Sequence, residues 1–315
     1  MPCTMEAMIE AARVLNGVEI AAAIKAEVGT EVRLLRAAGV TPALAVVLVG
    51  HVAASEIYVR SKVKASGELG IRSEMHTPPE TVTTEEMLAL VADLNARDEV
   101  DGILIQLPLP AHVNARLLLE AVSPEKDVDG FHPINAGRLQ SGRPALEPCT
   151  PAGIMQILQR GGISVAGKHA VVVGRSDIVG KPAAMMLLNA NATVTVCHSK
   201  TVDIAQYTRE ADILVAGIGR PGFVTADMVK RGATLIDVGI NRLTDAEDVE
   251  RFFPGDAARA TQFAERGSTL VGDIDPAAFA KSGAYTPVPG GVGALTIAML
   301  MHNTVKAAKA RRGRA

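Results

Sequence analysis

KHAVVVGRSDIVGKP, residues Lys168–Pro182, is the stretch that decides the fold of this chain. Its small and β-branched residues at 170–173 are typical of a buried strand, and Gly174 begins a tight turn that leads into a helix. Such a unit can hold a phosphate, because the turn lets the backbone approach an anion and the helix N-terminus offers free N–H groups. We interpret the stretch as the start of a dinucleotide-binding domain.

The glycine spacing alone does not decide this interpretation, since Gly174 and Gly180 are separated by five residues and a purely structural turn is the alternative. The next expected strand, residues 192–197, is more informative. It ends in His-Ser-Lys-Thr (198–201), where an NAD site would carry an acid for the ribose 2′-OH. Hydroxyl and basic groups suit a 2′-phosphate instead, so the sequence favours NADP.

The composition is that of a water-soluble α/β enzyme. The chain has 315 residues, enough for two domains, with 48% hydrophobic and 21% charged residues, and a net charge of −2. This charge argues against a general nucleic-acid binder. No apolar run approaches membrane-spanning length and no signal peptide is evident, so we expect a cytoplasmic protein with no membrane partner.

The three cysteines, Cys3, Cys149 and Cys197, lack C-x-x-C spacing, so neither a disulfide framework nor a zinc site is expected. Asp127 and Asp129 could suggest another metal, but no third cluster of ligands is near them in sequence. We therefore expect no metal.

Helical and strand patterns alternate along the first half of the chain. We expect helices over 18–38, 55–69 and 87–96, and strands over 43–49 and 102–106. This β-α-β-α-β series predicts a parallel sheet. Thr150-Pro151 reads as a helix start, with Thr at the N-cap and Pro at N1.

The second half predicts a doubly wound, Rossmann-like domain with strands over 169–173, 193–197, 213–216 and 234–238. Residues 245–267 read as a charged surface insertion. A final helix over 294–310 is expected to pack back on the first domain. The predicted fold is α/β with two domains: an N-terminal α/β catalytic domain, 1–150 completed by 285–315, and a Rossmann-like NADP-binding domain, 151–284.

Tyr58 and Lys62 are four residues apart, so they share one face of their helix. A phenol beside an amine is a recurring acid/base arrangement, although an amphipathic helix with an ordinary lysine is the plain alternative. The spacing also fits the Tyr-x-x-x-Lys pair of short-chain dehydrogenases. We reject that family, because it places its glycine turn before the pair.

Three further segments could carry chemistry. Gln106 stands where an apolar strand ends, the edge at which open α/β sheets bind ligands. Asp129 could pair with the N–H edge of an aminopyrimidine, or simply form a turn before Gly130. TPVPGGVG, 286–293, combines stiff prolines with glycines that allow a ligand to approach the backbone.

Together these motifs resemble the bifunctional methylenetetrahydrofolate dehydrogenase/methenyltetrahydrofolate cyclohydrolase family. The resemblance covers about residues 15–306 and rests on motifs that occur in order: YVRSK (58–62), GILIQLPLP (102–110), PEKDVDGFHPINAGRL (124–139), PCTPAG (148–153), VVVGRSDIVGKP (171–182), CHSKT (197–201), DVGIN (237–241), LVGDID (270–275) and TPVPGGVG (286–293). Ala294, where proline is frequent, and the long insertion after Asn241 depart from the pattern.

The resemblance implies oxidation of 5,10-methylenetetrahydrofolate with NADP, then hydrolysis to 10-formyltetrahydrofolate in one-carbon metabolism and purine biosynthesis, by a homodimer. It implies that Lys62 is the key catalytic residue, that Gln106 tunes it, that Tyr58 stacks on or hydrogen-bonds near the folate, and that Asp129 anchors the pterin. The implied substrate-binding set also contains Ser55, Ile105, Leu107, Cys149, Pro289, Gly290, Gly291, Val292 and Gly293. The implied cofactor set is Gly174, Arg175, Ser176, Ser199 and Ile240.

Two other functions were weighed. A related Rossmann oxidoreductase acting on an amino acid or a malate-like acid leaves GILIQLPLP and TPVPGGVG unexplained. A nucleotide-binding sensor without catalysis would be favoured by loss of Lys62, Gln106 or Asp129, and all three are present. A monofunctional enzyme with weak cyclohydrolase activity remains an alternative.

Overall fold

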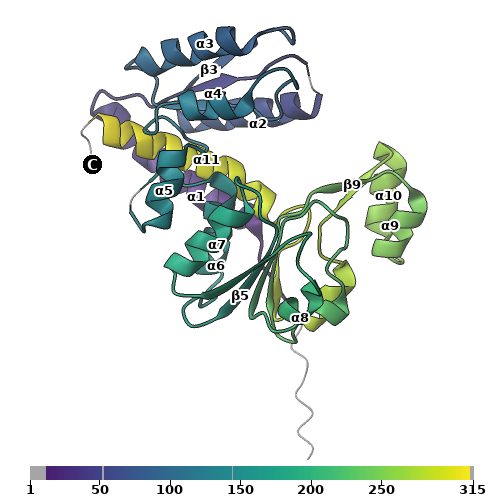
Figure 1. The fold of residues 1–315 in the computed structure, drawn as a ribbon. Coiled ribbons are helices and arrows are strands. Elements are labelled where there is room, and N and C mark those ends of the chain that lie inside the picture. The colour runs from purple at the N-terminus through teal and green to yellow at the C-terminus, as the bar shows by residue number, and fades with distance from the viewer. Residues whose placement is uncertain (1–11, 52, 144, 313–315) are drawn as a thin grey trace, which may run out of the picture. The chain divides into compact units, whose positions relative to one another are not determined.

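The computed structural model describes residues 12–51, 53–143 and 145–312. The chain forms two compact units, each made of segments that are far apart in sequence (Figure 1). The first, which we call the small-sheet unit, contains 18–156, 177–186 and 293–315. The second, the large-sheet unit, contains the described residues of 12–17, 157–176 and 187–292. Cys3 lies outside the described residues.

A three-stranded parallel sheet forms the centre of the small-sheet unit. Its strand order is β3 (Arg72–His76), β2 (Ala43–Val47), β4 (Gly102–Ile105). Every residue of β2 and β4 is buried, as expected for strands covered on both faces. Val47 is paired with Ile105, so both strands end at the same edge. The strands expected over 43–49 and 102–106 are confirmed, whereas β3 was not placed from the sequence.

Helices accompany this sheet, and their ends follow local capping rules. Thr83 and Glu86 form a capping box at the start of α3, each side chain accepting the other's backbone N–H. The helix expected to start with Thr150 as its N-cap instead begins at Cys149, so Thr150 lies inside its first turn. The helices that lie mainly in this unit are α1 (Gly17–Ala37), α2 (Ala53–Leu69), α3 (Thr84–Ala96), α4 (Ala115–Ala121), α5 (Pro133–Gln140), α6 (Cys149–Arg160), whose last four residues belong to the large-sheet unit, and α11 (Val292–Arg311).

The C-terminal helix α11 is bonded to the first half of the chain. The side-chain Nδ2 of Asn303 donates to the carbonyls of Val128 and Glu147, both at 2.8 Å. At the end of the helix, Arg311 and Arg312 both bond the carboxylate of Asp101, which is completely buried. The final helix therefore packs on the N-terminal part of the chain, as the sequence predicts.

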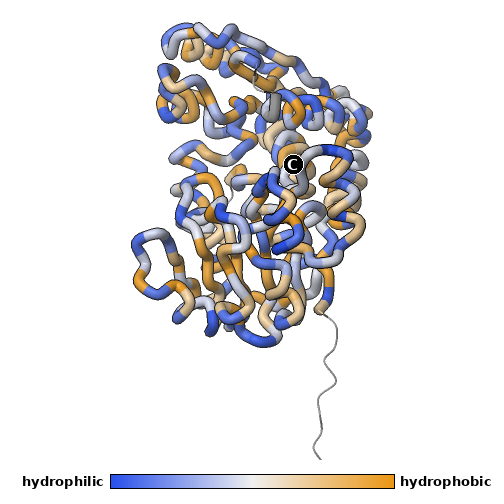
Figure 2. Tube along the Cα trace, turned by 90° about the vertical axis from the view of Figure 1, so that its right-hand side faces the viewer, coloured by the Kyte–Doolittle hydropathy of each residue, from blue (hydrophilic) through white to orange (hydrophobic). Residues whose placement is uncertain are grey.

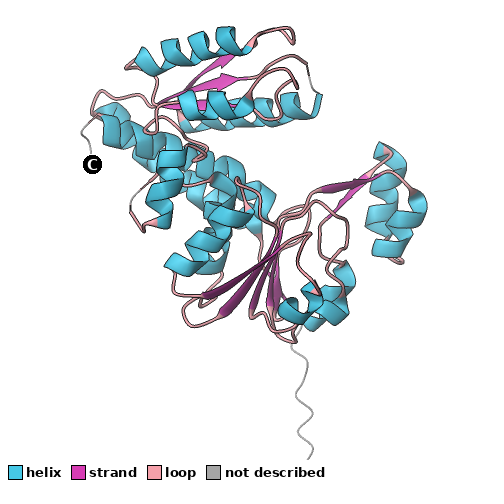
Figure 3. Ribbon diagram, viewed as in Figure 1, coloured by secondary structure: helices cyan, strands magenta, loops and turns pink. Residues whose placement is uncertain are grey.

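The large-sheet unit contains a six-stranded parallel sheet (Figure 3). Its order is β1 (Arg13–Val14), β11 (Ala284–Tyr285), β8 (Thr234–Asp237), β7 (Ile213–Ala216), β5 (His169–Val173), β6 (Thr193–Cys197). The chain places β6 on one side of β5 and then β7 on the other, so the strand order reverses at β5. Such a switch point is where doubly wound sheets bind ligands. The four strands predicted here are confirmed.

Three helices of this unit that lie outside the insertion after Asn241 are short. They are α8 (Ile204–Thr208) and the 3₁₀ helices η1 (Ala226–Met228) and η2 (Pro276–Lys281). The helix α7 (Gly180–Asn189), which follows the glycine turn in sequence, is shared between the two units.

The insertion after Asn241 is a folded structure with a small core of its own. An antiparallel hairpin, β9 (Asn241–Leu243) and β10 (Thr269–Val271), leads to α9 (Ala246–Phe252) and α10 (Ala257–Arg266). Leu243, Val249, Phe252 and Val271 are buried together. Asp256 caps α10 at its start, and Gly267, with a φ of 64°, ends it. Sequence analysis predicted the surface insertion but not its helices.

No helix in the described part of the chain is long and apolar enough to cross a membrane. Hydrophobic and hydrophilic residues instead alternate along the helices in Figure 2.

Candidate functional site

Lys62 and Gln106 are brought together in the small-sheet unit. Lys62 lies on α2 with only 7% of its surface exposed, and Gln106 follows the last residue of β4. The Lys62 Nζ donates to the Gln106 Oε1 at 2.9 Å. The Gln106 side chain is oriented at its other end too, because its Nε2 donates to the Leu107 carbonyl at 2.6 Å. A buried ammonium is thus held at the carboxyl edge of the sheet.

Two more candidates share the helix of Lys62. Ser55, Tyr58 and Lys62 are spaced by three and four residues, so they lie along one face of α2. Ser55 is buried, while Tyr58 is 44% exposed, an unusual position for an aromatic ring in a unit built from aliphatic side chains. A ligand that covers the ring would remove this apolar surface from water.

Asp129 is close enough to Lys62 for their charges to interact. Burial raises the pKa of its carboxyl to about 6, although the nearby Lys62 charge lowers it and Asp127 raises it further. No hydrogen bond to this carboxylate is recorded among the described residues. Asp129 is partly buried, and its carboxylate can accept hydrogen bonds from an N–H edge.

The loop that carries Asp129 is fixed by its two preceding residues. Asp127 accepts hydrogen bonds from the backbone N–H groups of Phe131 and His132, at 3.2 and 2.8 Å. Lys126 is buried and donates to the carbonyls of Leu94, Asn95 and Arg97, at 3.1, 2.8 and 2.7 Å. The end of α3 therefore anchors the loop. Sequence reasoning missed Lys126, because a lysine in a charged loop gives no sign that it points inward.

Cys149 lies behind this cluster at the start of α6. Its Sγ donates to the Val128 carbonyl at 3.4 Å, and burial, the first cause, raises the pKa of its thiol well above the usual value. The thiol is therefore held protonated, which fits a neutral wall of the site rather than a nucleophile. Ile105, also expected to line the site, is buried in β4.

The residues predicted to bind the cofactor lie at the carboxyl ends of the strands of the large sheet. Gly174, Arg175 and Ser176 follow β5, Ser199 follows β6, and Ile240 follows β8. The turn requires glycine at 174: φ is 134°, and an added Cβ would lie 2.4 Å from the Gly217 carbonyl oxygen. Arg175, Ser176, Ser199 and Ile240 are all exposed at this edge. The chemistry of these groups fits a dinucleotide with a 2′-phosphate.

Two aspartates that sequence reasoning left without a role brace this edge. The Asp237 carboxylate accepts from the backbone N–H groups of Gly239, Asp273 and Ile274, each at 2.9 Å. Asp273 in turn accepts from the N–H groups of residues 218–220, at 2.6–2.9 Å. Burial raises the pKa of Asp237 to about 7. Both aspartates lie in motifs quoted above, DVGIN and LVGDID, but a motif does not show which donors its carboxylate meets.

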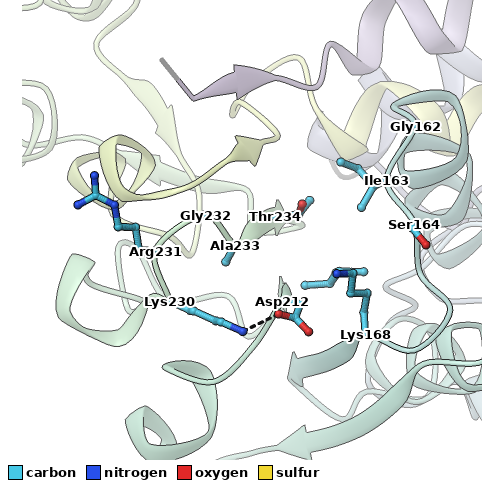
Figure 4. Close-up of a pocket in the computed structure, with 11 residues that line it drawn as sticks. Gly162, Ile163, Ser164, Lys168, Asp212, Lys230, Arg231, Gly232, Ala233 and Thr234 are labelled. Atoms are coloured by element: carbon cyan, nitrogen blue, oxygen red, sulfur yellow. Dashed lines mark hydrogen bonds and ion pairs between the residues drawn. The ribbon is translucent and has the colours of Figure 1, made fainter. Parts of the chain in front are cut away.

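A pocket of about 230 Å³ in the same unit is not this site (Figure 4). It is lined by Lys168, Asp212, Lys230 and Thr234, which stand at the amino ends of the strands. Lys230 points at Asp212 and bonds it at 2.6 Å, so this charge already has a partner. Ligands of doubly wound sheets bind at the opposite edge.

These features define a class of protein: a two-part α/β dehydrogenase, with a dinucleotide site on a doubly wound sheet and a lysine site on a second unit. Two family models then identify the family. Residues 15–129 match the catalytic domain of tetrahydrofolate dehydrogenase/cyclohydrolase, and residues 148–312 match its NAD(P)-binding domain. The chain therefore belongs to the tetrahydrofolate dehydrogenase/cyclohydrolase family, as the sequence motifs predicted.

Individual relatives agree. The chain is 64% identical to the bifunctional protein FolD of Koribacter versatilis over 96% of this chain and 98% of that protein. It is 46% identical to the crystal structure of the bifunctional enzyme FolD from Campylobacter jejuni, with a TM-score of 0.87 over 96% of this chain and 100% of that one. The Trypanosoma brucei enzyme, solved with NADP and an inhibitor, is 38% identical with a TM-score of 0.86, over 97% and 100% of the two chains.

Proposed function

We propose that this enzyme oxidises 5,10-methylenetetrahydrofolate to 5,10-methenyltetrahydrofolate with NADP and then hydrolyses that product to 10-formyltetrahydrofolate. The observation that carries the proposal is the bond between the buried Lys62 Nζ and the Gln106 Oε1, near the Asp129 carboxylate. This cluster offers one cation and one anion at fixed positions. That combination suits a substrate whose pterin edge donates hydrogen bonds and whose reacting carbon exchanges protons with water.

We assign catalytic roles to Lys62, Tyr58, Gln106 and Asp129. The Lys62 ammonium holds a proton near the reacting nitrogen and carbon, and Gln106 fixes its Nζ through their 2.9 Å bond. Asp129 accepts the N–H donors of the pterin, and Tyr58 covers its ring. When water adds to the methenyl carbon, it loses a proton and the ring C–N bond opens; Lys62 is placed to move protons in that step.

We assign the rest of the folate-binding set to Ser55, Ile105, Leu107 and Cys149 in the small-sheet unit and to the glycine-rich loop, Pro289–Gly293. In domain terms, the folate-binding catalytic domain is residues 1–150 completed by 285–315. The dinucleotide-binding domain is 151–284.

Gly174, Arg175, Ser176, Ser199 and Ile240 would hold NADP, which accepts the hydride when bound. Arg175 and Ser199 follow adjacent strands, and both are exposed. A guanidinium and a hydroxyl there can bond a 2′-phosphate. Residues 198–201 contain no acidic side chain that would repel this phosphate.

We further propose a cytoplasmic homodimer that serves one-carbon metabolism and purine biosynthesis. The support for the dimer is the edge strand β6, where Val196 and the nearby Val202 are exposed. An unpaired strand edge with apolar side chains is a surface that a second copy can cover. The proposal includes no nucleic-acid or membrane partner, in keeping with the net charge of −2.

An absorbance assay tests the proposal directly. The full chain is incubated with 5,10-methylenetetrahydrofolate and either NADP or NAD, while the methenyl product and the reduced cofactor are followed. We expect turnover with NADP and a fall of the methenyl signal as it is hydrolysed. No change with either cofactor would refute the proposal, and stable accumulation of the methenyl form would restrict it to a dehydrogenase.

A further inference from the structure

Arg259 of the insertion 241–271 is bonded to the loop 286–293. Arg259 lies on α10 and donates through Nη1 to the Leu270 carbonyl at 2.9 Å and to the Thr269 Oγ1 at 3.2 Å. Its Nη2 donates to the carbonyl of Val288, at 2.6 Å. One side chain therefore joins the insertion's second helix, its second strand and the loop that contains Pro289.

The guanidinium of Arg259 bonds backbone carbonyls and a hydroxyl. No ion pair of this residue is recorded among the described residues, and burial lowers its pKa, with only the charge of Asp256 opposing. Its guanidinium stacks on the ring of Phe253, with the Cζ 4.4 Å from the ring centroid. A half-buried charge of this kind is tolerated when its donors are satisfied. Here two backbone carbonyls and the Thr269 hydroxyl accept hydrogen bonds from it, and Val288 supplies one of the carbonyls.

The loop 286–293 is bonded at its start, and Pro289 in its middle is exposed. The backbone N–H of Thr286 donates to the Leu235 carbonyl at 3.0 Å, and its Oγ1 accepts from the N–H of Asp237 at 2.8 Å. On another side, Gly17 is so close that an added Cβ would lie 2.0 Å from the Gly291 oxygen. Pro289 remains exposed. The bond from Arg259 therefore acts between the fixed start of the loop and its exposed tip.

The insertion can serve as a rigid support because its helices are well ended and share a core. Asp256 accepts from the N–H groups of Ala258 and Arg259 itself, at 3.0 and 3.1 Å. Val249 and Phe252 of α9 are buried against the hairpin. The direction of the Arg259 side chain is thus set by structure on both sides of it.

We propose that Arg259 is a positioning residue: it holds loop 286–293 in the conformation that binds the folate substrate, so the insertion acts in substrate binding. The inference rests on the proposed function, which assigns Pro289–Gly293 to the folate. It gives the long insertion a task beyond covering surface.

The test compares Arg259→Met and Arg259→Lys with Arg266→Met, a matched control at an exposed arginine of the same helix. Steady-state kinetics with methylenetetrahydrofolate and NADP give the two KM values and kcat. Loss of a charge-assisted bond predicts a folate KM about tenfold higher in Arg259→Met. The NADP KM and kcat should stay within about twofold of wild type. Arg259→Lys, which keeps one charged donor, should fall between them, and Arg266→Met should match wild type.

Amide hydrogen exchange supplies a readout that does not need activity. Exchange in residues 286–293 should be faster in Arg259→Met than in wild type or Arg266→Met. An unchanged folate KM, or an equal change in both KM values with a lower Tm, would overturn the inference. If Arg259→Met does not fold, Arg259→Lys decides by the same criteria. If the wild-type enzyme does not oxidise methylenetetrahydrofolate, the proposed function is refuted. The hydrogen-exchange result still decides whether Arg259 holds the loop.

Discussion

Lys62 is the single residue on which the hydrolytic step should depend most. We expect Lys62→Met to lower cyclohydrolase turnover at least about 100-fold, since a positioned proton-transfer group contributes 10²–10⁴-fold. Methionine keeps the length of the buried stem, so the fold should survive. Lys64→Met, at an exposed lysine one half-turn away, is the control and should leave turnover unchanged. Full cyclohydrolase activity in a folded Lys62→Met protein would contradict the assignment.

The ionised Asp129 carboxylate should lower the free energy of unfolding while it strengthens folate binding. Its folded pKa of about 6 lies above the usual 3.8, so its contribution to stability is full below pH 3.8 and is lost as the pH rises through 6. Asp129→Asn should therefore raise the unfolding free energy at pH 7.5 by at most about 3 kcal/mol, with no gain near pH 3.5. Thermal melts across this pH range measure the effect.

The same substitution should weaken folate binding, because an amide cannot accept as strongly as a carboxylate. In wild type the folate KM should rise as the pH falls below about 6, and in Asp129→Asn it should be high at every pH. Asp93→Asn, an exposed change on α3, controls for the loss of one negative charge. An Asp129→Asn protein with an unchanged folate KM would remove Asp129 from the site.

At the scale of elements, the end of α11 should contribute measurably to the free energy of unfolding. Asp101 is buried, and it is bonded by Arg311, by Arg312 and by the N–H of Ala43 at 3.0 Å. Ending the chain after Ala310 leaves this charge without its two cations. We expect a loss of about 3–5 kcal/mol of unfolding free energy, measured by urea titration.

Two matched chains test the cause of that loss. Ending the chain after Arg312 should cost little, and adding Asp101→Asn to the shorter chain should recover part of the stability, since no buried charge is then unpaired. If the chains that end after Ala310 and after Arg312 have equal unfolding free energies, the bonds of Arg311 and Arg312 with Asp101 contribute nothing to stability.

Which elements could be predicted follows from how their residues signal burial. Val171 and Leu214 stand in short apolar runs between turns, so their strands were found, with the correct parallel arrangement. β3, RSEMH, is partly exposed and has no apolar alternation. β1 and β11 have two residues each, too few for any pattern. The caps of α10, Asp256 and Gly267, are local signals from which the bounds of this helix can be predicted.

Some residues of the candidate site could be predicted from the sequence and others could not, for the same reason. Motif positions such as Gln106, at the end of an apolar run, could be predicted because strand ends define the ligand edge. The inward direction of Lys126 and the bonds of Arg259 depend on side-chain placement between segments distant in sequence. Nothing in the local sequence of either residue encodes that placement.

At the scale of the whole molecule, the proposed dimer should depend on the β6 edge. Val202 is 86% exposed, so Val202→Asp leaves the monomer fold intact while placing a charge on the surface that a second copy would cover. Sedimentation should show a dimer of the 32.9 kDa chain in wild type and a monomer in the variant. The control is Leu34→Asp, which changes another exposed hydrophobic residue, on α1. This variant should remain dimeric. A Val202→Asp dimer would place the interface elsewhere.

The return of α11 to the first half of the chain has a consequence during synthesis. Asn303 bonds the carbonyls of Val128 and Glu147, and Lys306 bonds that of Ala145. Those carbonyls leave the ribosome more than a hundred residues before their donors do. The strands β5 to β8 are close in sequence and can pair as they emerge. The part of the nascent chain that is translated first is therefore completed last, and until then it must be kept from aggregating.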